Sequence, residues 1–175
     1  MDIPKRLTWA VGLLGPAPGD RVLEIGCGRG VAVALLCARL TTGTVTAVDR
    51  SATAVEGARR RNREAVETGR AAFQVRSLAD ADFAAGSFDR VLAVNVNLFW
   101  TGSADAELTA LRRWLAPGGL LCLCWEPPDG SRAGEIAGKV GRAVAAHGFE
   151  TTTVRDGVLV AVLGVLPGKR RAGEP

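Results

Sequence analysis

The sequence predicts an α/β fold in which helices cover both faces of a mostly parallel sheet. Short β-branched runs alternate along the chain with longer stretches of helical period, a pattern typical of parallel sheets. The first run, Val22–Ile25, is apolar except for Glu24, as expected for a strand covered on both faces. Near the C-terminus, Asp156-Gly157 separates two apolar runs and predicts a tight hairpin, which makes the last strand antiparallel. We therefore expect three layers around a sheet of seven strands.

Length and composition favour a single domain. The chain has 175 residues, of which 47% are hydrophobic and 23% are charged. This composition is ordinary for a folded domain and too apolar for a disordered chain. We expect the domain to span residues 1–166, with an N-terminal helix over residues 1–16. The basic segment 167–175 is expected to be a disordered tail.

Charge, cysteines and apolar runs exclude several classes of protein. The net charge of +4 is mild and permits contact with nucleic acid without indicating it. The four cysteines form no C-x-x-C pair and His147 is the single histidine, so no metal site is expected. No run reaches the roughly 18 apolar residues of a membrane span, and the first residues make a poor signal peptide. Buried thiols suit a reducing compartment, so we expect a cytoplasmic protein.

The first half of the chain should contain three strands, the first two of them followed by helices. A helix that is apolar on nearly all sides follows the first strand and continues to Leu40. After the second strand, Ser51 is a suitable N-cap and Gly69 a suitable stop for one long helix. Ala52 and Val66 belong to its expected buried face. The strands of this half are expected over residues 22–25, 44–48 and 73–76.

The second half should contain two more parallel strands, two helices and the hairpin. A helix over residues 103–115 places leucines at core spacing. The turn Pro117-Gly118-Gly119 separates that helix from the following strand. A helix over residues 131–147 is stopped by Gly148. The strands of this half are expected over residues 88–95, 120–125, 149–154 and 158–166.

The most informative local feature is the turn Gly26-Cys27-Gly28-Arg29-Gly30, between the first strand and its helix. Glycines permit positive φ and let a ligand lie directly on the backbone, while amides at a helix start favour an anionic group. A turn that only packs the helix on the sheet would have the same composition. Asp49 ends the neighbouring strand, where a carboxylate can bind both hydroxyls of a ribose or compensate a helix start. Together, the glycine-rich turn and Asp49 favour an adenosine-containing cofactor.

The glycine spacing separates two classes of cofactor. The dinucleotide fingerprint is G-x-G-x-x-G, and Val31 stands where it needs the third glycine. The run V-L-E-I-G-C-G-R-G over residues 22–30 resembles the first motif of class I S-adenosylmethionine-dependent methyltransferases. Residues 47–49, 86–91 and 111–119 resemble, in order, that family's ribose-binding acid, fourth-strand entry and turn before the fifth strand. The resemblance covers about residues 20–125 and implies a Rossmann-like three-layer sandwich.

The resemblance implies S-adenosylmethionine as the cofactor. Gly26 and Gly28 would approach its methionine part. Glu24 would orient the loop or meet the ammonium group through water, and Asp49 would hold the ribose. The implied cofactor-binding residues are Glu24, Gly26, Cys27, Gly28, Gly30, Asp49, Arg50, Ser77, Leu78 and Asn95.

The chain departs from the family after the third strand. The family often has an acid there that binds the adenine amino group, followed by alanine. Counting along the chain places Ser77 and Leu78 at these positions. Ser77 can still accept a hydrogen bond and Leu78 can pack on the ring, while Asp80 is the carboxylate that could substitute for the missing acid.

Methyl transfer should take place beyond the carboxyl end of the fourth strand. Transfer from a sulfonium is an in-line displacement, for which the protein mainly supplies alignment and a dry pocket. The ligand of an open α/β sheet lies where the strand order reverses, which places Asn95 beneath the methyl group. Phe99 and Trp100 are either pocket walls or core side chains. Glu126, at the end of the fifth strand, is a base, an acceptor-binding carboxylate or a solvated loop acid. We expect Asn95 and Glu126 to be catalytic and His147 to cap its helix.

The expected function is methylation of a small-molecule acceptor. The N-terminal helix with Trp9 is expected to close over the cofactor. Few residues remain for a substrate-binding insertion, so specificity should come from that helix and from the loops after the fourth and fifth strands. The alternatives are an RNA- or protein-modifying methyltransferase, a non-catalytic S-adenosylmethionine-binding module and, last, a nicotinamide reductase. Arg59-Arg60-Arg61 could contact nucleic acid, but glutamates at pairing distance favour a solvated helix face. We expect neither nucleic acid nor membrane as a partner, and a homodimer is left open.

Overall fold

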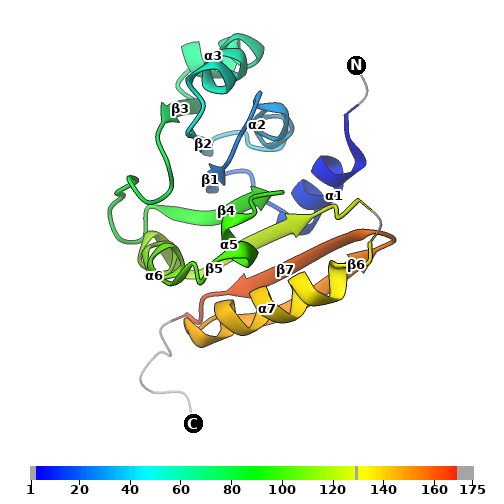
Figure 1. Ribbon diagram of the computed structural model, residues 1–175. Helices are drawn as coiled ribbons and strands as arrows, with labels where there is room; N and C mark the ends of the chain where they lie inside the picture. Colours follow the sequence, from blue (N-terminus) through cyan, green and yellow to red (C-terminus); the bar gives the residue numbers. More distant parts are fainter. Residues whose placement is uncertain (1–2, 129, 169–175) are drawn as a thin grey trace.

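The computed structural model describes residues 3–128 and 130–168. Its strands form one seven-stranded sheet in the order β3-β2-β1-β4-β5-β7-β6, with helices on both sides (Figure 1). The predicted α/β fold is therefore confirmed. The strands are β1 (Arg21–Ile25), β2 (Thr44–Asp49), β3 (Ala71–Val75), β4 (Phe88–Val94), β5 (Leu115–Trp125), β6 (Glu150–Asp156) and β7 (Leu159–Val165).

Pairing of the strands sets where a ligand can lie. Strands β1 to β5 pair in parallel, whereas β7 is antiparallel to both of its neighbours, β5 and β6. The last strand is thus antiparallel, as the hairpin signal predicts. The strand order reverses at β1, which lies between β2 and β4. In open parallel sheets, ligands bind beyond the carboxyl ends of the strands at such a reversal.

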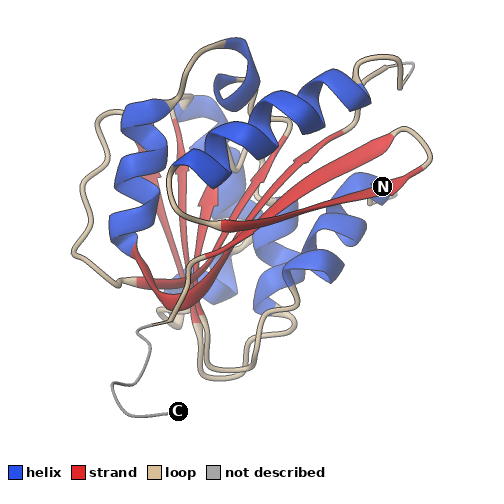
Figure 2. Cartoon of the chain, turned by 90° about the horizontal axis from the view of Figure 1, so that it is seen from below, coloured by secondary structure: helices blue, strands red, loops and turns tan. Residues whose placement is uncertain are grey.

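Helices lie on both faces of the sheet (Figure 2), and each face carries its own apolar core. Along β1, Leu23 and Ile25 belong to one core and Val22 to the other, because side chains alternate across a strand. Among the described residues, no helix is long and apolar enough to cross a membrane. One face carries α1 (Lys5–Leu14), α2 (Val31–Cys37), α3 (Ala52–Arg61) and α4 (Arg63–Glu67), and the other carries α5 (Leu98–Thr101), α6 (Asp105–Trp114) and α7 (Ala133–Ala146).

The single helix predicted over residues 52–68 is wrong, because two helices meet at Asn62. The Asn62 side chain is buried and donates hydrogen bonds to the carbonyl oxygens of Gly30 and Ala58, at 3.0 and 2.9 Å. Its backbone, with φ −107° and ψ 30°, leaves the helical region. The buried face predicted for this helix is also wrong at both ends, since Val66 is 36% exposed and Ala52 is exposed.

Other element boundaries also differ from the prediction. The N-terminal helix begins at Lys5 and ends before Gly15, which is left-handed with φ 51°, so it is shorter than residues 1–16. Residues 117–119 form an irregularity inside β5, opposite Asp89 of β4, instead of a turn before the strand. The short helix α5 was not predicted. Of the predicted tail, residues 169–175 lie outside the described residues.

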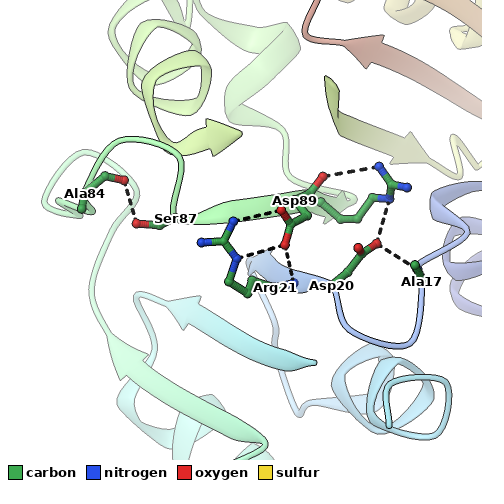
Figure 3. Close-up of polar contacts among 7 residues, drawn as sticks. Ala17, Asp20, Arg21, Ala84, Ser87 and Asp89 are labelled. Atoms are coloured by element: carbon green, nitrogen blue, oxygen red, sulfur yellow. Dashed lines mark hydrogen bonds and ion pairs between the residues drawn. The ribbon is translucent and has the colours of Figure 1, made fainter. Parts of the chain in front are cut away.

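Charged side chains fasten β1 to β4 at their amino ends (Figure 3). Asp89 accepts hydrogen bonds from the backbone amide of Arg21 at 2.8 Å and from its guanidinium at 2.9 and 3.0 Å. This guanidinium holds the pKa of Asp89 below its ordinary value. Asp20 forms an ion pair with Arg90 at 3.2 Å. These contacts fix β1 to β4. The carboxyl ends of these two neighbouring strands carry the site.

Candidate active site

The loop after β1 brings bare backbone to the carboxyl ends of the strands. Its three glycines have φ between 51° and 71°, a region in which glycine is not strained. The amides of Gly26 and Cys27 donate to the carbonyl oxygen of Val48 at 2.8 and 3.2 Å, which fixes the loop on the end of β2. A Cβ atom at Gly26 would lie 2.8 Å from Cγ2 of Val96. Glycine therefore lets the loop lie close to the segment that follows β4.

Two residues of this loop, Gly30 and Cys27, are buried in the interior. A Cβ atom at Gly30 would lie 2.6 Å from Nδ2 of Asn62 and 2.8 Å from Cβ of Ala58, so this buried glycine allows α2 to pack against α3. The side chain of Cys27 is buried, and burial raises the pKa of its thiol to about 12, so it stays protonated. Neither residue lines the cavities described below. For both, direct contact with a cofactor stays a prediction.

Asp49 occupies the predicted position at the end of β2 and is half-buried. Its Oδ2 accepts the backbone N–H of Gly28 at 2.8 Å, and its Oδ1 accepts that of Ser51 at 2.9 Å. The carboxylate therefore joins the glycine loop to the start of α3. Because a carboxylate has about four acceptor sites, it keeps capacity for ligand hydroxyl groups.

Glu24 is a buried carboxyl group inside β1, with 4% of its surface exposed. Burial and the nearby charge of Asp49 raise its pKa to about 8, while the Val33 amide acts in the opposite direction. The group is therefore mainly protonated at neutral pH. Its Oε2 atom has no hydrogen-bond partner among the described residues. Glu24 thus lies in the strand before the loop, not at its exposed end.

A cavity of about 720 Å³ extends along the carboxyl ends of β1 to β4. This volume lies within the usual range of small-molecule and cofactor sites. Of the predicted site residues, the cavity brings together Gly26, Asp49, Arg50, Ser77, Leu78 and Asn95. Lining residues that the sequence reasoning missed are Arg76, Leu98, Thr101 and Glu107. Arg76 directly precedes Ser77, so a charged residue at a strand end was a signal that could have found it.

Ser77 is held by its own loop. Its hydroxyl donates to Oδ2 of Asp80 at 2.6 Å and accepts the Asp80 backbone N–H at 3.2 Å. Asp80 is not among the residues that line the cavity, so contact between its carboxylate and an adenine amino group stays a prediction. The charged side chains at this end of the cavity are those of Arg50 and Arg76 beside Asp49.

Asn95 joins the ends of β4 and β5. It has a positive φ of 57°, a conformation that asparagine tolerates better than most residues. Its Oδ1 atom accepts the backbone N–H of Glu126 at 2.9 Å, and its own N–H donates to the carbonyl oxygen of Cys124 at 2.8 Å. The Glu126 carboxylate in turn accepts a hydrogen bond from Nη1 of Arg6 at 2.8 Å. The carboxylate predicted as a base is therefore an ion-pair partner of α1.

A second cavity, of about 290 Å³, adjoins the first. Asn95 and Asn97 line both cavities. Phe99 is a core side chain with 1% exposure, whereas Trp100 lines the second cavity, so each of the two expected roles holds for one residue. The other residues that line the second cavity are Trp125, Glu126, Pro127, Pro128, Arg132 and Ile136.

Two expectations concern residues outside these cavities. Trp9 packs against the apolar core shared by α1 and α2, and no described residue of α1 lines either cavity. The expectation that this helix closes over the cofactor is therefore wrong. His147 lies at the end of α7, where its Nδ1 is 2.7 Å from the carbonyl oxygen of Ala143, so its predicted capping role is confirmed. No cluster of metal-ligating side chains occurs in the described part of the chain.

Comparison with known proteins gives consistent matches. A family model described as a methyltransferase domain matches residues 22–119. Trans-aconitate 2-methyltransferase of Paracidovorax citrulli is 30% identical over 83% of this chain and 53% of its own. The O-methyltransferase cnsE of Penicillium expansum is 33% identical over 67% of this chain and 42% of its own. The crystal structure of a SAM-dependent methyltransferase from Aquifex aeolicus has a TM-score of 0.77 at 18% identity, with 94% of each chain covered. This chain spans about half the length, or less, of the curated relatives that it matches.

The cavity fits the cofactor that the resemblance implies. A Cβ atom at Gly28 would meet nothing within 4 Å, so the loop backbone is open to a ligand. Asp49 lines the same cavity and keeps acceptor capacity for a ribose. The matched family model spans the glycine loop, Asp49 and β4, and it covers more than half of the 175 residues. On these grounds, the chain belongs to the class I S-adenosylmethionine-dependent methyltransferases.

Proposed function

We propose that this chain transfers a methyl group from S-adenosylmethionine to a small-molecule acceptor. The observation that carries the proposal is the meeting of two cavities at Asn95 and Asn97. The larger cavity has the size of a cofactor site and includes Asp49, and the smaller one is walled by tryptophan and proline side chains. The names of two relatives, a trans-aconitate 2-methyltransferase and an O-methyltransferase, support an acceptor of this kind.

The order of the strands suggests how the cofactor would be held. Asp49 at the end of β2 would bind the ribose hydroxyls. Because β2 lies between β3 and β1, the base would lie towards Ser77 and Leu78 and the methionine part towards Gly26. When bound, the cofactor supplies a methyl group on a positively charged sulfur. The chain's own part is to align the acceptor at Asn95 and to exclude water.

The arginines of α3 and α4 support a small molecule over nucleic acid. In α3, Arg60 forms an ion pair with Glu56, and in α4, Arg63 forms one with Glu67. Such pairs neutralise the positive charge that would otherwise attract the phosphate groups of a nucleic acid. Arg59 donates a hydrogen bond to a backbone carbonyl oxygen. An RNA-modifying activity that used these helices would instead need exposed, uncompensated cations on them.

Domain extent, location and assembly stay predictions. We infer one domain over residues 1–166. The four cysteines are free and buried, which supports a reducing compartment such as the cytoplasm. Light scattering on the purified chain would detect a homodimer as a doubled mass.

Ligand-induced stabilisation tests the proposal. S-Adenosylmethionine or S-adenosylhomocysteine at about 100 times its dissociation constant should add roughly 2.7 kcal/mol of stability, seen as a raised melting temperature. NADH and NADPH should give no shift. Asp49→Ala should lose most of the shift, whereas Asp82→Ala, at an exposed position outside both cavities, should keep it. Circular dichroism of the ligand-free variants checks that both fold. No shift with either sulfur nucleoside in folded wild-type protein would refute the proposal.

A further inference from the structure

We propose that the acceptor is a small carboxylic acid, which is methylated on its carboxylate oxygen and held in the second cavity by Arg132. This inference rests on the proposed function and adds the chemical class of the acceptor. It stands on two independent features of the second cavity. The first is an excess of hydrogen-bond donors over acceptors among its described lining residues. The second is the lack of a free general base.

Asn95 and Asn97 line both cavities, and the amide oxygen of each already accepts one hydrogen bond. Oδ1 of Asn95 accepts the backbone N–H of Glu126 at 2.9 Å. Oδ1 of Asn97 accepts the indole N–H of Trp100 at 3.2 Å. Each amide oxygen has two acceptor sites, of which one is taken, whereas no described residue accepts a hydrogen bond from either NH₂ group. Both residues therefore offer the cavity more donors than acceptors.

Arg132 adds a planar cation to the same cavity. Its guanidinium carbon lies 4.3 Å from the centre of the Trp100 ring, a stacking arrangement that restrains the orientation of the charge. Nε and Nη2 are 3.0 and 3.3 Å from the Glu135 carboxylate, which leaves Nη1 for another partner. A guanidinium offers donors in a fixed plane, which suits the two oxygens of a carboxylate.

Trp125 supplies a buried donor without a partner. The side chain is 3% exposed and lines the second cavity. Its indole N–H has no hydrogen-bond partner among the described residues. Leaving a buried donor unsatisfied costs about 1–3 kcal/mol, so a ligand oxygen that accepts this N–H would relieve a penalty already present. The remaining walls, Pro127 and Ile136 among them, are apolar and suit a small carbon skeleton.

Among its described lining residues, the second cavity offers no free base for removing a proton from the acceptor. None of them is a histidine, and the one carboxylate among them is that of Glu126, which is bound by Arg6 at 2.8 Å. The Glu107 carboxylate lines the first cavity but not the second. A carboxylic acid has a pKa of about 4 and is already ionised at neutral pH, so it needs no base. A hydroxyl acceptor would need one.

The chemistry balances without a proton donor or acceptor. A lone pair of the acceptor's carboxylate oxygen forms the new O–C bond to the methyl carbon. The C–S bond breaks, and its electron pair stays on sulfur, which becomes a neutral thioether. The carboxylate becomes a neutral methyl ester, and no proton moves. Loss of the acceptor's charge weakens its attraction to Arg132, which favours release of the ester.

A panel of acceptors tests the chemical class. Small carboxylic acids that include benzoate and succinate are compared with their matched amides and alcohols, using S-adenosylmethionine with a tritiated methyl group. Products should form with acids alone, and mild base should release the label as methanol, which is diagnostic of an ester. Label transferred only to amides, alcohols or amines, or to no compound of the panel by protein that binds the cofactor, would overturn the inference. Failure of the proposed function would appear separately, as absent cofactor binding.

Replacing Arg132 tests its role in specificity. Arg132→Gln should raise KM for the best acid about ten- to a hundredfold with little change in kcat, the signature of lost ground-state binding. Arg142→Gln, at an exposed position on the same helix, should leave KM unchanged. Binding is also measured without turnover, as quenching of tryptophan fluorescence by the acid in the presence of S-adenosylhomocysteine. Equal binding of the acid by wild type and Arg132→Gln would overturn the role of Arg132.

Discussion

Replacing Glu24 with glutamine should remove a loss of stability that grows with pH. The pKa of Glu24 is raised from 4.5 to about 8 in the folded chain, mainly because the group is buried. The folded state therefore keeps its proton to higher pH than the unfolded state does. Stability from this group is fully present below pH 4.5 and is lost as the pH rises through about 8. Over this window, at 1.36 kcal/mol per pH unit, the loss amounts to roughly 5 kcal/mol.

Urea denaturation at several pH values between about 5 and 8, followed by tryptophan fluorescence, measures this effect. Glutamine keeps the shape of the side chain but cannot ionise, so at pH 5 the variant and wild type should be similarly stable. As the pH rises, Glu24→Gln should become the more stable protein, by up to about 1.4 kcal/mol per pH unit. Glu150→Gln, at an exposed site, is the matched control and should show no such trend. A difference between Glu24→Gln and wild type that is constant across this range would refute the raised pKa.

Further substitutions probe three regions, namely the loop, the base of the sheet and the strand ends. Gly30→Ala should destabilise the fold by about 2–4 kcal/mol, because φ is +71° and the new Cβ would lie 2.6 Å from its nearest neighbour. Gly69→Ala has a φ of +73° and open space, so it should lose only about 1 kcal/mol. Equal losses in urea denaturation would contradict the packing role of Gly30. Asp89→Asn should lower the free energy of unfolding by about 1 kcal/mol at neutral pH, since it breaks a charge-assisted contact that is partly exposed. The carboxylate has a lowered pKa, so this difference should vanish as the pH falls below 3.8 through the folded-state pKa, and acid-range melts that retain it would argue against the prediction. Asn95→Asp keeps the acceptor that joins β4 to β5, so kcat should stay near the wild-type value, whereas loss of the NH₂ donor should raise KM for an acid acceptor. Asn95→Gly tolerates the same backbone but loses this bond, so kcat should fall about tenfold at an unchanged melting temperature, and equal rates in both variants would refute the positioning role.

Part of the candidate site could be predicted because it depends on strand ends. Asp49 ends β2 and Ser77 lies two residues after β3, and the carboxyl ends of parallel strands meet at one edge of a sheet. Counting along the sequence was therefore enough to place them on one cavity with Gly26. Counting along the sequence could not predict which hydrogen bonds these side chains form. The bond from Ser77 to Asp80 depends on the local path of the loop.

Contacts between distant segments could not be predicted. Arg6 and Glu126 are 120 positions apart, and their ion pair exists because α1 packs beside the end of β5. The stacking of Arg132 on Trp100 joins the start of α7 to the unpredicted helix α5. The break at Asn62 also has a distant cause, since its side chain is held by a carbonyl of the glycine loop.

By itself, the sequence determined the α/β alternation, the antiparallel hairpin and the pairing of the glycine loop with Asp49. These features depend on residues that are neighbours along the chain, where periodicity and turn chemistry act directly. Tertiary structure alone decided that Gly30 and Cys27 face the core, that α1 contributes no residue to the cavity walls and that Arg132 reaches the second cavity. The physical reason is that such contacts depend on how separate elements pack, and local residue patterns do not specify that packing.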